Sequence, residues 1–174
     1  MKTISRALLF GSSLVAATAA FVAISAQSVE SLQGKALPAF TMTDLNGKKI
    51  TSQSLRGKVV LIDLWATWCG PCQKASPVMQ SLHNKYGGRG LVVIGANTWE
   101  NNDKTGANAR KYRDQHKYTY LFTYNNDALA KAWNVEGIPT MILLDKQGKV
   151  SKVFVGFDPS LEKQLSSAIE PLLK

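Results

Sequence analysis

The two cysteines of this 174-residue chain stand two residues apart, where an apolar run gives way to a helical pattern. The run 59–65 is partly β-branched and predicts a buried strand, and the residues from Pro71 onward have helical periodicity. At a helix N-terminus, unpaired backbone N–H groups and the macrodipole favour negative charge, so a thiol there ionises more readily than a free cysteine. We therefore predict that Cys69 is the attacking thiolate. Cys72, one helical turn further on, is then the resolving thiol that closes a disulfide with it.

Two other uses of a Cys-x-x-Cys pair fit this sequence less well. Half of a zinc site needs further ligands, and the only histidines, His83 and His116, are not in ligand-pair spacing. A structural disulfide that closes so short a loop removes little entropy from the unfolded chain. The pair is therefore interpreted as a redox centre. Its thiol-disulfide chemistry calls for no metal or organic cofactor.

The segment Trp68-Cys69-Gly70-Pro71-Cys72 resembles the active site of the thioredoxin superfamily. The superfamily's buried acid, the proline that kinks its active-site helix, its cis-proline loop and a glycine of its last strand correspond to Asp63, Pro77, residues 137–140 and Gly156. The resemblance covers about residues 34–174. It implies one α/β domain with a mixed sheet and helices on both faces.

Within the superfamily, three features resemble the TlpA-like and ResA-like branch: the N-terminal export signal, the lead-in 37–40 and an extra segment near residues 100–125. Members of this branch are exported thiol-disulfide reductases, several of which serve cytochrome c maturation. The resemblance implies that backbone groups around Ile138 pair with the substrate chain, and that Pro139, in a cis peptide bond, keeps metals away from the thiols. The substrate-binding residues expected on this ground are Trp68, Gly70, Pro71, Ile138 and Pro139.

Asp63 interrupts the apolar strand with a carboxyl group that is costly to bury in its ionised form, so we expect a raised pKa if it lies inside. Such a group can take the proton from Cys72 when the mixed disulfide is resolved. The alternative is an exposed edge-strand aspartate or a hydrogen-bonded structural one. In the TlpA-like branch a glutamate often stands three residues after the second cysteine, where this chain has Ala75. This departure places more weight on Asp63 and argues against a specialised cytochrome c role.

The first 26 residues have the pattern of a secretory signal peptide. Lys2 and Arg6 precede the uncharged stretch 7–26, which is rich in Ala, Leu, Val and Ser and ends in small residues. Because this stretch approaches the ~20 residues that span a bilayer, an uncleaved N-terminal anchor is the alternative. We expect export to the periplasm or to the outer face of the cytoplasmic membrane. Residues 27–36 would form a polar lead, loosely ordered or serving as a tether, before a thioredoxin-like domain at 37–174.

Export constrains the partners. Two thiols in an oxidising compartment become oxidised unless a partner supplies reducing equivalents, so a membrane electron carrier is implied. The substrates would be disulfide-containing exported proteins, with apocytochrome c as one candidate. The formal charge is +9, but the basic residues are scattered, and nucleic acid is not an expected partner. The densest basic group, at 104–117, is interpreted as a solvated helix face, with docking of an acidic partner or an anionic membrane as the alternative.

The remaining elements follow from periodicity and turn signals. Asn46-Gly47 predicts an N-terminal β-hairpin between 38–42 and 49–51. Further strands are expected at 91–96, along the alternating aromatics 118–124, and as a hairpin of 141–145 with 150–155. A short helix at 127–133 would turn Leu129, Ala132 and Trp133 inward, and a terminal helix would span 160–173. The aromatic run and the polar stretch before it form the expected central insertion.

The expected reaction is thiol-disulfide exchange, most simply the reduction of target disulfides. A thiol peroxidase of the redoxin group would have threonine three residues before its reactive cysteine, where this chain has Ala66 followed by Thr67. A non-enzymatic copper carrier of related fold would use Cys-x-x-x-Cys with a distal histidine. An oxidase is the third alternative, although Gly70-Pro71 matches the dipeptide of reducing thioredoxins.

Overall fold

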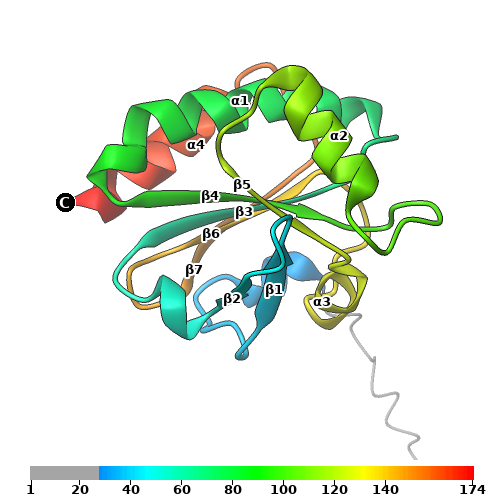
Figure 1. Ribbon diagram of the computed structural model, residues 1–174. Coiled ribbons are helices and arrows are strands. Elements are labelled where there is room, and N and C mark those ends of the chain that lie inside the picture. Colours follow the sequence, from blue (N-terminus) through cyan, green and yellow to red (C-terminus); the bar gives the residue numbers. More distant parts are fainter. Residues whose placement is uncertain (1–27) are drawn as a thin grey trace, which may run out of the picture.

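A mixed seven-stranded sheet organises the computed structural model, which describes residues 28–174 (Figure 1). The strand order is β2-β1-β5-β4-β3-β6-β7. β3 runs parallel to β4 and β4 runs parallel to β5, whereas the outer pairs are antiparallel. The strands are β1 Thr41–Asp44, β2 Lys49–Thr51, β3 Val59–Trp65, β4 Leu91–Asn97, β5 Leu121–Tyr124, β6 Thr140–Leu144 and β7 Val150–Val155. The expected signal peptide or anchor at 1–26 lies outside the described residues.

Helices cover both faces of the sheet, as expected for a thioredoxin-like fold (Figure 1). One face packs against α1 Gly70–Tyr86, α2 Ala107–His116 and α4 Leu161–Ile169. The other packs against α3 Asp127–Ala132 and the 3-10 segments η1 Val29–Leu32 and η2 Gln53–Leu55. Two further 3-10 segments, η3 Gly87–Arg89 and η4 Glu170–Leu173, follow α1 and α4. Within residues 28–174, no helix has the length and apolarity needed to cross a bilayer.

The central strand β3 is buried along its whole length because both of its faces are covered. Leu61 and Trp65 point into the core beneath α1, whereas Ile62 and Leu64 point into the opposite core. Side chains alternate along a strand, so Asp63 faces the same side as Leu61 and Trp65. The apolar run at 59–65 therefore has the length and burial predicted, and its one polar side chain points toward the helix that carries the cysteines.

The segment at 29–36 is not the loosely ordered lead expected from its polarity. Val29 is only 4% exposed and packs into the core on the α3 side of the sheet. The Gly34 amide donates to the Val150 carbonyl at 2.8 Å, and the Val150 amide donates to the Lys35 carbonyl at 2.8 Å. The expectation is wrong here because backbone groups at the edge of β7 provide partners that the local sequence does not reveal.

Three elements differ in detail from the sequence-based expectations. β5 begins only at Leu121, so Tyr118 and Tyr120 precede the strand and pack on its aromatic side. In α3 the buried alanine is Ala130, whereas Ala132 is exposed. The terminal helix becomes 3-10 at Glu170, next to a proline that lacks a backbone N–H donor. The two predicted hairpins, β1 with β2 and β6 with β7, are confirmed.

Candidate active site

The two cysteines lie in the turn from β3 into α1 and are joined by a disulfide, with their Cα atoms 5.2 Å apart. Cys69 is the N-cap residue of α1, and its Sγ accepts a hydrogen bond from the Cys72 amide at 3.2 Å. Cys69 is 5% exposed, whereas Cys72 is 0% exposed. Of the two cysteines, only Cys69 is therefore open to an incoming thiolate, and a thiolate formed on Cys72 is confined to reacting inside the protein.

The start of α1 favours a negative charge on Cys69. The first turn carries no acidic residue, and a proline occupies one of the first two helical positions, where no intrahelical amide partner is lost. The free N–H groups and the macrodipole of a 17-residue helix stabilise an anion at the N-cap. Gly70 and Pro71, the two residues between the cysteines, are exposed. The turn thus supports the ionisation of Cys69 that the sequence predicts.

The loop before β6 reaches the cysteines from the neighbouring strand. The Ile138–Pro139 peptide bond is cis, as expected, and the Ile138 carbonyl oxygen lies 3.7 Å from Cys69 Sγ. Pro139 is buried, and its carbonyl accepts a hydrogen bond from the Gly156 amide at 2.8 Å. A backbone segment is thereby fixed beside the one accessible sulfur, where an extended chain bound at Cys69 would meet it.

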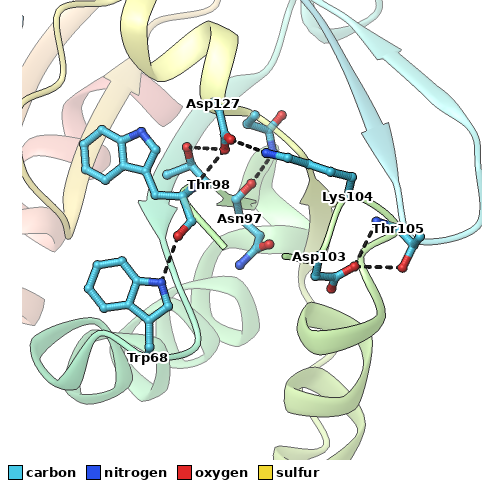
Figure 2. Close-up of polar contacts among 9 residues, drawn as sticks. Trp68, Asn97, Thr98, Asp103, Lys104, Thr105 and Asp127 are labelled. Carbon is cyan, nitrogen blue, oxygen red and sulfur yellow. Dashed lines mark hydrogen bonds and ion pairs between the residues drawn. The ribbon is translucent and has the colours of Figure 1, made fainter. Parts of the chain in front are cut away.

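Trp68 presents an aromatic surface next to Cys69, with 53% of the residue exposed. Its indole N–H donates to the Trp99 carbonyl oxygen at 2.9 Å, which fixes the ring against the segment that follows β4 (Figure 2). A large exposed indole held in one orientation is a suitable contact for an apolar side chain of a binding partner.

Asp63 is fully buried on the face of the sheet that α1 covers. Neither carboxyl oxygen has a hydrogen-bond partner among residues 28–174. Burial raises the pKa of Asp63 from 3.8 to about 7. The expectation that Asp63 lies inside the protein is confirmed, and an exposed edge-strand position is excluded. Its carboxyl group therefore exchanges a proton near neutral pH.

The turn also depends on residues that the sequence analysis did not select. Trp65 at the end of β3 pairs in register with Asn97 at the end of β4, so the segments that follow the two parallel strands emerge side by side. Glu100, only 8% exposed, accepts hydrogen bonds from the Thr67 amide at 3.1 Å, from the Thr67 hydroxyl and from the Asn97 side chain at 2.7 Å. The usable signal was the position of Glu100, three residues after a strand end at the edge that carries the cysteines.

The chain resembles known proteins at the levels of family, sequence and structure. Residues 32–169 match the model of the family described as Redoxin. The chain belongs to the redoxin family. Redoxin relatives include the thiol-disulfide oxidoreductase ResA of Bacillus thuringiensis (strain Al Hakam), 34% identical over 124 residues that cover 71% of this chain and 69% of the relative. The thioredoxin-like protein YneN of Bacillus subtilis (strain 168) is 31% identical over 124 residues, covering 71% of this chain and 72% of the relative.

A solved structure agrees with this assignment. The crystal structure of a putative thiol:disulfide interchange protein DsbE from Chlorobium tepidum superposes with a TM-score of 0.74 at 29% identity. The match covers 82% of this chain and 98% of the other. The resemblance to the thioredoxin superfamily, in its ResA-like branch, is thereby confirmed. This redoxin is a thiol-disulfide oxidoreductase.

Proposed function

We propose that this redoxin reduces disulfides in exported proteins by exchange through Cys69 and Cys72. The supporting observation is the unequal exposure of the two cysteine residues. Cys69 meets solvent beside the Ile138 carbonyl, and Cys72 is enclosed beneath α1. Such an arrangement separates attack on a partner from resolution inside the protein.

In the proposed reaction the Cys69 thiolate attacks one sulfur of the target disulfide. A mixed disulfide forms between Cys69 and the target, and the other target sulfur leaves as a thiolate. Asp63, as a carboxylate, takes the proton from the Cys72 thiol, and the Cys72 thiolate then attacks Cys69 Sγ. The target leaves as a dithiol, and two electrons have passed from the enzyme, which now carries the Cys69–Cys72 disulfide. Trp68, Gly70, Pro71 and the backbone at Ile138 and Pro139 would contact the bound target chain.

A dithiol electron carrier in the membrane would regenerate the enzyme by the same exchange in reverse. The placement of the protein outside the cytoplasm rests on the N-terminal sequence: two basic residues before an uncharged stretch at 7–26, acting as a cleaved signal or as a tether. Exported proteins with disulfides are then the substrate class, and apocytochrome c is a candidate among them. Ala75, where the related branch often carries glutamate, favours a general reductase.

The reduction potential of the Cys69/Cys72 pair tests the direction of electron flow. The purified protein would be equilibrated in dithiol buffers of graded potential. A value near the ~−270 mV of thioredoxin supports a reductant, whereas a value near ~−120 mV would make the protein an oxidant and reverse the assignment. In parallel, Cys69→Ser should abolish reduction of a disulfide-bonded protein, and Cys72→Ser should trap the mixed disulfide.

The structure gives the peroxidase alternative little support. The Thr67 hydroxyl, the nearest candidate for binding a peroxide, donates to the Glu100 carboxylate instead. Rapid oxidation of Cys69 by added peroxide would nevertheless establish that activity. The copper-carrier alternative needs a histidine near the thiols, but the His116 ring packs 4.3 Å from the Tyr112 ring and 5.4 Å from the Tyr118 ring on α2 and the segment that follows it. Retention of Cu(I) by the reduced protein would restore this alternative.

A further inference from the structure

The turn 66–69, which leads from β3 to Cys69, is hydrogen-bonded to the segment 97–100 at the end of β4. Two adjacent residues of the turn are bound by two adjacent residues of that segment. Thr67 donates its amide and its hydroxyl to the Glu100 carboxylate, and Trp68 donates its indole N–H to the Trp99 carbonyl. All three donors belong to the two residues directly before Cys69, and both acceptors belong to Trp99 and Glu100, so a shift of one segment moves the other.

The side chain of Glu100 is almost enclosed, with 8% of the residue exposed. A buried carboxylate is stable only where hydrogen-bond donors replace water, and here Thr67 supplies two donors and Asn97 a third. Among the described residues, Glu100 forms no ion pair. Removing its side chain would leave the Thr67 amide and hydroxyl without their acceptor, at the position two residues before Cys69.

The segment 97–100 is itself fixed by hydrogen bonds to Asp127, the first residue of α3 (Figure 2). Asp127 accepts hydrogen bonds from the Trp99 amide at 2.7 Å and from the Thr98 hydroxyl at 3.2 Å, and pairs with Lys104 at 2.6 Å. Trp99 has a φ of +52°, a left-handed backbone conformation that a bulky residue adopts only where its surroundings impose it. The contacts of Asp127 supply that constraint, and the conformation directs the Trp99 carbonyl toward Trp68.

We propose that Glu100 is a positioning residue for Cys69, a role that rests on the proposed function of that cysteine as the attacking thiolate. By binding both donors of Thr67, Glu100 fixes the turn so that Cys69 Sγ stays at the N-terminus of α1 and beside the Ile138 carbonyl. Misplacement of a reacting atom by about 1 Å can lower a rate by about 100-fold. The backbone N–H groups at the helix start stabilise the thiolate only within the first turn, so the reactivity of Cys69 depends on this placement.

The test measures the chemistry of Cys69 without any protein substrate. Reduced protein would be alkylated with iodoacetamide across pH 4 to 9, and the disulfide of the same variants would be titrated for its reduction potential. In Glu100→Ala we expect the rate constant at neutral pH to fall by about tenfold or more, with a higher apparent thiolate pKa and a more negative potential. Glu100→Gln keeps a carbonyl acceptor for Thr67 and should recover part of the rate. Thr67→Val removes the hydroxyl contact alone and should give a smaller loss.

Matched variants separate positioning from loss of structure and of charge. Glu162→Ala removes an exposed acid on α4 and should leave the alkylation profile unchanged. Circular dichroism and thermal unfolding show whether Glu100→Ala is folded at the assay temperature; if it is not, Thr67→Val decides. An unchanged profile in a folded Glu100→Ala, faster alkylation, or an equal loss in Glu100→Ala and Glu100→Gln would overturn the proposal. Because alkylation needs no target protein, a failure to reduce disulfides in the parent protein would refute the proposed function separately.

Discussion

Asp63 carries a carboxyl group into the middle of a strand that is otherwise apolar and buried on both faces. The apolar run and the resemblance favour this burial, but the sequence left an exposed edge-strand position open, and the structure excludes it. The absence of a hydrogen-bond partner among residues 28–174 was not predictable, since it depends on which side chains of β4, β6 and α1 surround the carboxyl group. Burial without a partner raises the pKa of Asp63 to about 7 and gives the residue measurable consequences.

The first consequence concerns stability. The folded protein holds the Asp63 proton more tightly than the unfolded chain, because the pKa rises from 3.8 to about 7 on folding. The contribution of protonated Asp63 to the free energy of unfolding is therefore fully present below about pH 4 and is lost as the pH rises through 7. Between pH 5 and pH 8 this group alone should lower the free energy of unfolding by about 2–3 kcal/mol. Urea unfolding of oxidised parent and Asp63→Asn proteins at both pH values measures it, and parallel pH profiles for the two proteins would contradict it.

The second consequence concerns catalysis. If Asp63 takes the proton from Cys72, the rate of resolution should rise as the pH passes through about 7, where the carboxyl group ionises. In Asp63→Asn we expect this step of the pH profile to disappear and the rate at neutral pH to fall by about 100-fold. Stopped-flow release of the dithiol product from the mixed disulfide reports the step. A profile identical to that of the parent protein would assign the proton transfer to another group.

Gly95, the β4 partner of Asp63, shows how tightly the site is packed. A Cβ atom at this position would lie 3.1 Å from Trp65 Nε1 and 3.1 Å from Tyr120 Cε2. Both rings are buried, so they cannot move aside freely, and Gly95→Ala should lower the free energy of unfolding by about 1–3 kcal/mol. Gly88→Ala is the control, because nothing lies within 4 Å of its added Cβ. Equal denaturation midpoints for the two variants would show that the rings can rearrange.

At the scale of elements, the docked segment at the N-terminus of the described chain has a testable energy. A protein that begins at residue 37 loses Val29, whose burial contributes about 1.5–3 kcal/mol, together with the hydrogen bonds to Val150. We expect its unfolding free energy to be lower by at least this amount than that of a protein beginning at residue 28. Val29→Ala in the longer protein should reproduce part of the loss, whereas Glu30→Ala, at an exposed position, should not. Equal stability of the two lengths would mean that the segment is only loosely attached.

Elements whose signals are local were predictable from the sequence. The strand at 59–65, the Asn46-Gly47 hairpin and the start of α1 at the cysteines follow from periodicity and turn residues alone. The contacts that hold the site are of a different kind, because they join residues about 30 positions apart: Thr67 meets Glu100 only because β3 and β4 are parallel and in register. Periodicity places each strand but does not give its register, so the sequence could place Glu100 near the site but could not show that it meets Thr67.

At the scale of the whole molecule, the site lies at the edge of the sheet where the parallel strands β3 and β4 both end (Figure 1). Loops from the centre of the sheet converge there: the turn into α1, the segment after β4 and the loop before β6. The fold that brings these loops together is shared with the Chlorobium tepidum DsbE structure, so the fold supplies the convergence and the loop residues supply the chemistry. The resemblance carried by the Trp68–Cys72 motif was sufficient to predict this arrangement.

The enclosure of Cys72 limits how the enzyme can be supplied with electrons. Since only Cys69 can be attacked from outside, the donor that recharges the protein and the target that it serves must occupy the same patch of surface in turn. The electron donor and the target protein therefore never bind at the same time. The slower of the two half-reactions, reduction of the enzyme by the donor or reduction of the target by the enzyme, sets the turnover rate. Initial-rate measurements with the concentrations of donor and target both varied should give parallel double-reciprocal lines, the signature of a double-displacement mechanism. An excess of oxidised donor should slow the reaction, because it occupies the surface around Cys69 that the target needs.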